Sequence, residues 1–320
     1  MANNSSAFKS LHLGDGIPEY DIPKHGIPKP HLHPAQYRTI QPPINDANFR
    51  SLCANSSSKA VLAHIRATSG SGVVPINNHP FIFGIHSLMH NGLISNFEGV
   101  VKREIIKLIY DEAYDYIHGT TDSEHFAALF MTYLCPRIPK APMPLMPNPD
   151  LTPEAKDEIP RGWEENHSAE EMKEALLKTI KAIIKIQKKV LGEKALSNFF
   201  NIAVTDGKDL VACRFRNHKT LEPTSLYYST TAGTTLDSRY PGGDDDGRRR
   251  HGLELGNKNP KDHAKHVIIA SEPSTSKILD NWKKVEKNKV LLARSGGNTV
   301  EVIAMNVDDE FNAPNIILTN

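Results

Sequence analysis

The segment FFNIAVTDGKDLVACRF (residues 199–215) restricts the possible folds of this chain more than any other segment does. Two apolar runs flank the dipeptide Asp206-Gly207, whose residues readily adopt the conformation of a two-residue hairpin turn. Such a short connection joins neighbouring strands only when they run antiparallel. The second half of the chain is therefore predicted to form an antiparallel sheet. Four further apolar runs predict additional strands: SLYYST, HVIIASEP, KVLLAR and TVEVIAM.

Helices are predicted in the middle of the chain, where three capping boxes each precede a segment with helical apolar spacing. In a capping box, an N-cap hydroxyl and a Glu one turn later each accept a hydrogen bond from the other residue's backbone N–H. The three pairs are Ser95 with Glu98, Thr121 with Glu124, and Ser168 with Glu171. They predict helices over residues 96–117, 122–134 and 169–191, the last of them ending at Gly192.

Two short apolar runs before these helices, residues 59–66 and 81–90, are suited to buried strands. The order along the chain is thus strands, then helices, then strands again. This order is typical of an α+β fold in which helices flank one large sheet or two packed sheets.

Proline-rich and glycine-rich stretches divide the rest of the chain. Residues 1–50 are predicted to be an irregular N-terminal segment, because proline removes backbone donors and fixes φ. Residues 51–320 are predicted to form one domain, which is large enough to bury a sizeable core. Two flexible loops are expected to interrupt this domain, one near residues 136–166 and the other near residues 231–265.

Charge and cysteine content argue against several classes of protein. Lys and Arg number 38 and Asp and Glu number 37, so no global positive field favours nucleic acid. No apolar run approaches the roughly 20 residues that span a bilayer, and the polar start MANNSSAFKS lacks the apolar core of a secretory signal. Cys53, Cys135 and Cys213 form neither a disulfide framework nor a zinc-ligand pattern. We expect a cytoplasmic protein without metal or cofactor.

Four residues near predicted strand ends and helix starts carry the donors and acceptors that an amino-acid substrate requires. Arg66 could bind a carboxylate through its planar guanidinium, or form a structural salt bridge. Asn91 and Gly92 could direct a side-chain amide and a backbone N–H at an oxyanion, although the same dipeptide is typical of a type I′ turn. Asp122 could accept hydrogen bonds from an ammonium group, or interact with the helix dipole.

These residues occur in four motifs, in the order HIRATSG, HPF, MHNGLISNF and GTTDSE. In this order the motifs resemble those of the class II glutamine amidotransferases, and most closely the Dug-type subunits of the fungal glutathione-degrading complex. The resemblance implies the αββα four-layer sandwich of the N-terminal-nucleophile hydrolases. It also implies that Arg66, Thr68 and Asp122 bind the glutamyl head group, and that Asn91 and Gly92 form the oxyanion hole.

The resemblance implies a reaction as well. Members of this family use a Cys that follows the initiator Met: its free α-amine acts as the base, and its thiol attacks the γ-amide carbonyl. For the Dug-type complex the implied substrate is glutathione, which is cleaved at its γ-glutamyl bond. The implied partner is a larger metallopeptidase-like subunit.

The start of the chain departs from this pattern. Residue 2 is Ala where the family has Cys, and the first strands of the sandwich have no counterpart that the sequence makes plain. Cys53 is the nearest thiol before Arg66, but an internal Cys has no free α-amine. We therefore expect these 320 residues to lack the nucleophile and to be inactive by themselves. Either an N-terminally shortened enzyme or a true variant would explain this difference.

Two other functions stay open at this point. The chain could be a γ-glutamyl hydrolase for another γ-glutamyl amide, because the candidate residues recognise only the glutamyl half of a substrate. It could also be a non-catalytic subunit that stabilises or regulates a peptidase.

Overall fold

The computed structural model describes most of the chain between residues 33 and 306. The described stretches are residues 33–56, 58–67, 72–136, 161–232, 266–275, 277–278, 281–295 and 300–306. Residues 1–32, Thr68 and most of the two predicted loops lie outside them. Within the described stretches, no helix has both the length and the apolar character needed to cross a membrane.

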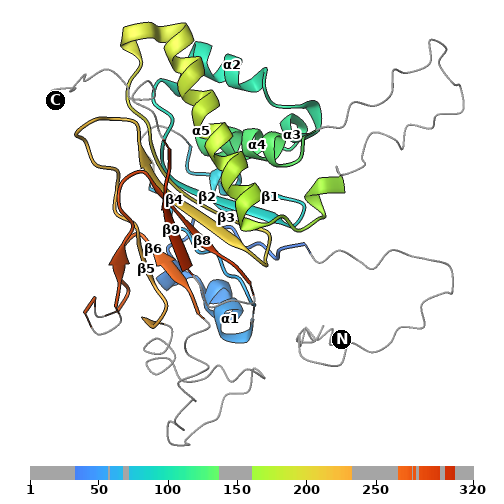
Figure 1. The fold of residues 1–320 in the computed structure, drawn as a ribbon. Helices are drawn as coiled ribbons and strands as arrows, with labels where there is room; N and C mark the ends of the chain where they lie inside the picture. Colours follow the sequence, from blue (N-terminus) through green and yellow to red (C-terminus); the bar gives the residue numbers. More distant parts are fainter. Residues whose placement is uncertain are drawn as a thin grey trace, which may run out of the picture.

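A six-stranded antiparallel sheet forms the centre of the fold (Figure 1), with the strand order β1-β2-β3-β4-β8-β9. The predicted hairpin is confirmed, because β3 and β4 pair antiparallel across Asp206-Gly207, where Gly207 has a φ of 85°. The six strands are β1 (Phe81–Phe83), β2 (His86–Leu93), β3 (Phe199–Thr205), β4 (Leu210–Arg216), β8 (Lys289–Ala293) and β9 (Val300–Ala304).

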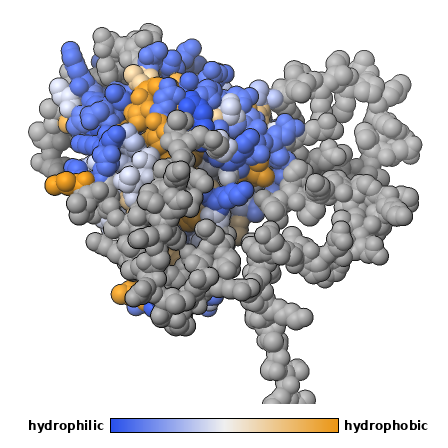
Figure 2. All heavy atoms as spheres, turned by 60° about the horizontal axis from the view of Figure 1, so that its bottom comes forward, coloured by the Kyte–Doolittle hydropathy of each residue, from blue (hydrophilic) through white to orange (hydrophobic). Residues whose placement is uncertain are grey.

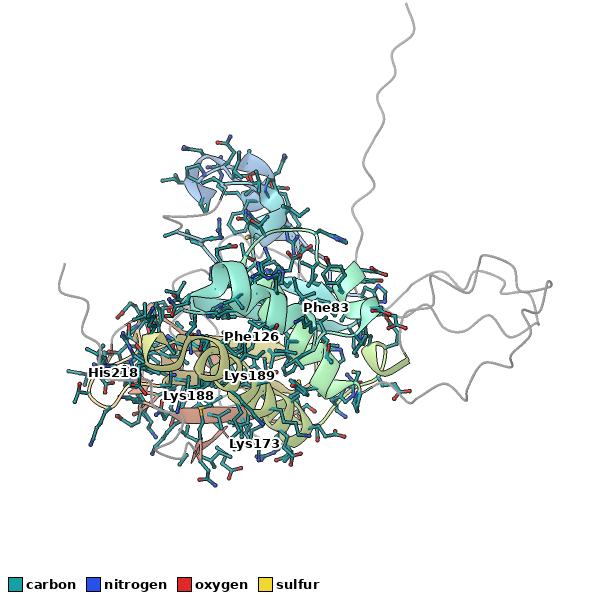
Figure 3. All side chains as sticks on the ribbon, turned by 90° about the horizontal axis from the view of Figure 1, so that it is seen from above. Phe83, Phe126, Lys173, Lys188, Lys189 and His218 are labelled. Atoms are coloured by element: carbon teal, nitrogen blue, oxygen red, sulfur yellow. The ribbon has the colours of Figure 1, made fainter. Side chains whose placement is uncertain are left out.

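Helices cover one face of this sheet (Figure 1). Two of the three capping boxes begin helices where predicted: Thr121 Oγ1 accepts the N–H of Glu124, and Ser168 forms a complete capping box with Glu171. The helices that follow them are α4 (Asp122–Leu134) and α5 (Ala169–Leu191). In Figure 3, the labels Lys173, Lys188 and Lys189 mark the two ends of α5. Two shorter helices, α2 (Lys102–Ile106) and α3 (Asp111–Asp115), complete this layer, whereas α1 (Ala47–Asn55) lies apart from it in Figure 1.

The main core lies between these helices and the sheet. Alternate residues of β3 face the helices, and Phe200, Ile202 and Val204 are each at most 1% exposed. Phe126 of α4, labelled in Figure 3, is fully buried and packs on the rings of His90 and Phe200, with centroid distances of 5.9 and 5.4 Å. The aromatic contacts therefore join the start of α4 to the middle of the sheet.

A second sheet packs on the other face of the first, with the order β6-β5-β7. Its strands are β5 (Tyr227–Ser229), β6 (Ile268–Ala270) and β7 (Lys283–Lys284). The residues buried in the cluster between the sheets are Ala212, Leu226, Val285 and Leu291. The predicted α+β class with two packed sheets is thus confirmed, and the described residues form three layers of helices, large sheet and small sheet. On the face drawn in Figure 2, the described surface is mostly hydrophilic with scattered apolar patches.

Arg214 of β4 links the two sheets. Its side chain is 1% exposed, and it donates to the backbone oxygens of Pro223 and Thr224, both at 2.8 Å, just before β5. It also donates to the backbone oxygen of Val285, at 3.4 Å, directly after β7. The carboxylate of Glu222 accepts a hydrogen bond from the same guanidinium at 3.0 Å. One cation thus satisfies several backbone oxygens that would otherwise be unpaired inside a sandwich.

The predicted single helix over residues 96–117 is wrong. Ser95 does not cap it, because its Oγ donates to the backbone oxygen of Ser197 at 2.6 Å. Glu98, the expected capping-box partner, has a non-helical ψ of 153°. Tertiary hydrogen bonds therefore replace the local capping box, and the segment divides into a kinked stretch at Phe97–Val101, where Glu98 and Gly99 have non-helical dihedral angles, followed by α2 and α3.

The predicted single strand over residues 81–90 is a hairpin instead. Gly84, with a φ of 56°, turns the chain between β1 and β2. A Cβ at this position would lie 2.3 Å from the backbone oxygen of Trp163. The turn therefore needs glycine both for its conformation and for this close approach.

The predicted strand over residues 59–66 is also wrong as a sheet element. Residues 61–66 have no regular secondary structure, and they pair with no strand among the described residues. Exposure alternates along residues 61–67, and the outward side chains include Val61 at 76% and Ile65 at 80%. The side chains of these residues thus alternate as in a β-strand, but no described strand forms hydrogen bonds beside them.

Replacing Arg214 by Met is expected to lower the free energy of unfolding by about 3–5 kcal/mol, because buried oxygens and a carboxylate lose their common donor. Arg294→Met is the matched control, since Arg294 bonds Glu170 and Glu301 on the surface and its side chain is 32% exposed. That change is expected to cost less than about 1 kcal/mol. Urea unfolding followed by circular dichroism measures the free energy of unfolding of both variants. Equal losses would contradict the role of Arg214 as the link between the two sheets.

Candidate active site

Asn91 and Gly92 lie within β2 and not in a turn. They pair with Asn201 and Phe200 of β3 as the fifth and sixth pairs of a seven-residue ladder. This placement excludes the type I′ turn that the dipeptide alone would favour. The backbone of both residues is therefore held by the sheet.

Gly92 is required by a close approach. A Cβ there would lie 2.1 Å from the backbone oxygen of Phe199 and 2.4 Å from Nε2 of His90. Both distances are shorter than any real Cβ contact, so a side chain at this position would displace the backbone or the imidazole. The absence of a side chain lets the imidazole of His90 lie directly against the backbone of residue 92.

The N–H of Gly92 points away from β3. Successive residues of a strand direct their N–H groups to opposite edges. Ile94, two residues later, donates its N–H to Asp122 instead of to a strand, so Gly92 faces the same side. On that side β1 pairs with β2 only as far as Leu88, and no other described strand continues the ladder. The backbone donor of Gly92 thus faces a part of the edge that the described strands leave open.

Asn91 faces the opposite side of the sheet from His90, because side chains alternate along a strand. Its side chain is exposed and makes no hydrogen bond with another described residue. Asn201, its partner in the ladder, is buried and donates to the backbone oxygens of Thr224 and Ser225 at 3.2 and 2.8 Å. The side-chain amide of Asn91 is therefore available for a ligand, whereas the side-chain amide of Asn201 binds the segment that leads into β5.

Asp122 begins α4, directly after the N-cap Thr121. Its Oδ2 accepts the N–H of Ile94 at 2.8 Å, and its Oδ1 accepts the hydroxyl of Ser123 at 3.3 Å. A carboxylate has about four lone-pair sites, so this half-buried group can still accept from an ammonium. The contact with Ile94 brings Asp122 to the end of β2, just beyond Gly92.

His90 connects the strand to the same helix end. Its Nδ1 lies 2.9 Å from Oγ of Ser123, and both side chains are buried, at 2% and 6% exposure. Burial lowers the pKa of His90, and the opposing charge of Asp122 does not reverse this. Burial thus favours the neutral imidazole, and a backbone hydrogen bond with Phe199 opposes part of the shift.

Arg66 lies beside two further histidines. The rings of His64 and His79 are 4.2 Å apart, and burial lowers their pKa values to about 4 and about 2. The charge of Arg66 contributes to both shifts, and so does His90. The structure thus brings the segment around Arg66 to the same group of histidines as β2. The guanidinium itself donates to the backbone oxygen of Gly72 at 3.4 Å.

The remaining predicted features are placed elsewhere or are not described. Thr68 lies outside the described residues. Cys213 is buried beside the backbone oxygen of Phe200, and Cys135 lies 3.8 Å from His167; burial raises the pKa of both thiols to about 12. Cys53 is exposed on α1. In the described part of the chain, no group of three His, Cys, Asp or Glu could hold a metal ion.

Sequence reasoning missed the group that surrounds the oxyanion candidates. His64, His79 and His90 each stand inside a motif that was singled out, but only other residues of those motifs were assigned roles. Ser123 was likewise passed over beside Asp122. Most of these residues are polar side chains at buried positions. That property can be recognised only when it is known which faces of the strand and the helix are buried.

Comparison with known proteins agrees with the motifs. The chain is 30% identical over 263 residues to the probable glutamine amidotransferase DUG3 of Saccharomyces cerevisiae, and the match covers 81% of this chain. The chain is thus similar in sequence to a probable glutamine amidotransferase. It spans 63% of the length of this yeast relative. No family model matches the chain.

Two solved structures are similar to this chain. The glutamine aminotransferase class-II domain protein of Silicibacter pomeroyi is 18% identical with a TM-score of 0.48, over 85% of this chain and 86% of that one. A predicted glutamine amidotransferase of Pseudomonas aeruginosa is 17% identical with a TM-score of 0.35, over 72% and 65% of the two chains.

Gly92→Ala is expected to lower the free energy of unfolding by about 1–3 kcal/mol, because the new methyl group overlaps a backbone oxygen and a buried imidazole. Gly72→Ala is the control, since a Cβ at Gly72 would meet no atom within 4 Å. Thermal and urea unfolding compare the two variants. A loss at Gly92 no greater than that at Gly72 would contradict the close packing described.

Acid is expected to destabilise the fold through the buried histidines. Because His64 has a folded pKa of about 4 against an ordinary 6.5, the unfolded chain binds more protons between these values. The stability contributed by neutral His64 and His79 is complete above about pH 6.5; the contribution of His64 is lost as the pH falls toward 4, and that of His79 as it falls toward 2. For His64 alone the loss is about 2–3 kcal/mol at pH 4.

Urea unfolding at pH 7.5 and pH 4.5 measures this dependence. His79→Phe is expected to reduce the loss, whereas His33→Gln, which changes an exposed partner of Glu164, should leave the loss unchanged. An equal loss in all three proteins would show that other groups cause the acid sensitivity.

Proposed function

We propose that this chain is a type 2 glutamine amidotransferase subunit that binds a γ-glutamyl group. The observation that carries the proposal is the bond from Ile94 to Asp122, because it unites two motifs that lie 28 residues apart. Through this bond an acidic group suited to an α-amine lies beside the strand whose Gly92 N–H faces an open edge. Relatedness to a probable glutamine amidotransferase supports the same function.

In this proposal each residue acts on one part of the glutamyl group. Asp122 accepts hydrogen bonds from the ammonium, and Arg66 binds the α-carboxylate as a planar pair of donors. The γ-carbonyl then lies against Asn91 and Gly92, whose amide and N–H stabilise the negative oxygen that forms during acyl transfer. These donors act most strongly on the transition state, because only there does the oxygen carry full charge.

The proposed reaction is hydrolysis of a γ-glutamyl amide through a thioester. A thiolate adds to the γ-carbonyl, the C–N bond breaks, and the leaving nitrogen takes the proton that the thiol gave to a base. Water then cleaves the thioester and releases glutamate. None of the three cysteines has a described contact with Asn91 or Gly92, so the described residues provide the binding half of this chemistry.

We propose glutathione as the substrate, with a larger metallopeptidase-like subunit as partner and the cytoplasm as the compartment. The support is the likeness of the motifs to the Dug-type subunits and the similarity to the yeast relative. Another γ-glutamyl amide is the alternative substrate, because the residues named above recognise only the glutamyl half. A purely non-catalytic role in a peptidase complex would require no ligand to bind at Asp122.

Binding of L-glutamine and L-glutamate, measured by isothermal titration calorimetry, tests the proposal. Asp122→Asn and Arg66→Met should each raise the Kd at least tenfold, because each removes a charge-assisted hydrogen bond worth about 1.5–3 kcal/mol. Asp122→Asn keeps an oxygen that can still accept from Ile94, so the scaffold contact is preserved.

Asp115→Asn is the matched control, because Asp115 is exposed on α3. It should leave the Kd unchanged. Absence of binding by the unaltered chain, or equal binding by the Asp122 and Asp115 variants, would refute the proposed glutamyl site and favour the non-catalytic role.

A further inference from the structure

The oxyanion candidates lie between two contacts to a single helix end. On one side His90 meets Ser123 at 2.9 Å, and on the other Ile94 donates to Asp122 at 2.8 Å. The two partners are consecutive residues in the first turn of α4. The segment 90–94 is therefore held against the start of α4 at both ends, with Asn91 and Gly92 between the two points.

The imidazole of His90 is fixed from several directions. Its ring packs on Phe126 of α4 and on Phe200 of β3, at centroid distances of 5.9 and 5.6 Å. Ser123 Oγ meets its Nδ1 and also donates to Asp122 Oδ1. The side chain is 2% exposed, so it cannot reorient without moving its neighbours.

The other nitrogen of this ring lies against the backbone of Gly92. A Cβ at Gly92 would approach Nε2 to 2.4 Å, so the ring occupies the place that a side chain would take. A shift of the ring toward the strand would therefore move the peptide of Gly92. A chain of contacts thus runs from the carboxylate of Asp122 through Ser123 and His90 to the proposed oxyanion donor.

We propose that His90 and Ser123 are positioning residues, which hold the N–H of Gly92 at a fixed place relative to the carboxylate of Asp122. The inference rests on the proposed function, in which Asp122 binds the α-amine and Gly92 faces the γ-carbonyl. Those two groups of glutamine are separated by a fixed number of bonds, so their binding partners must also keep a fixed separation. Neither positioning residue needs to touch the substrate for this role.

Nuclear magnetic resonance of the ¹⁵N-labelled chain can separate head-group binding from donor placement. Saturating L-glutamine should shift the amide signal of Gly92 in the unaltered protein, because the γ-carbonyl lies against this N–H. In Ser123→Ala and in His90→Phe, the Kd should stay within about threefold, since Asp122 and Arg66 remain. The shift of the Gly92 signal should fall to less than half, because the donor is no longer held at its place.

A second measurement needs no ligand. In the free protein, Ser123→Ala should speed hydrogen exchange of the Ile94 amide several-fold, since its acceptor Asp122 loses a hydrogen bond that restrains it. Thr132→Val is the control, because it removes a hydroxyl from the same helix that bonds only the backbone oxygen of Ala128. This control should change neither the exchange of Ile94 nor the signal of Gly92.

The outcomes distinguish this proposal from the proposed function. If glutamine does not bind, the glutamyl site fails, and the exchange of Ile94 alone decides whether the contacts from Ser123 position the strand. If glutamine binds but both variants keep the full Gly92 shift, the positioning role is overturned while the site stands. Ser123→Ala removes one oxygen atom only, so it remains informative even if His90→Phe does not fold.

Discussion

The fold depends on how the polar groups between its two sheets are satisfied. A buried guanidinium is costly unless its donors find acceptors, and Arg214 finds them in the backbone that leads into β5 and out of β7. Asn201 bonds the same approach to β5 from the neighbouring strand. Because Asn201 pairs with Asn91 in the ladder, the polar layer that joins the sheets extends to the proposed oxyanion strand.

Three consecutive residues of β2 direct their functional groups to the two faces and to one edge of the large sheet. His90 points to the helices, Asn91 to the opposite face, and the N–H of Gly92 to the edge that faces Asp122. A loop could present the same donors, but it would not hold them to a helix and to the neighbouring strand β3 at once. Gly92 and Asp122 are therefore held by the same strand and helix that form the core.

Short sequence motifs predicted correctly those elements that depend on contacts between residues close in the sequence. The hairpin at Asp206-Gly207 and the caps at Thr121 and Ser168 depend on residues within one turn, and all three were confirmed. The capping box at Ser95 failed because a distant backbone oxygen competes for its hydroxyl. Asn91, Gly92 and Asp122 could be chosen from their residue types, whereas the role inferred for His90 required knowing which side chains face α4.

The segment from residue 61 to residue 67 presents apolar side chains on the surface without a paired strand beside it among the described residues. Its outward side chains, Val61 and Ile65, are among the most exposed apolar groups in the described part of the chain. A row of backbone donors and acceptors beside such side chains is a template on which another polypeptide can build a ladder. Among the described residues no strand pairs with this segment, so a polypeptide that added a strand here would cover Val61 and Ile65.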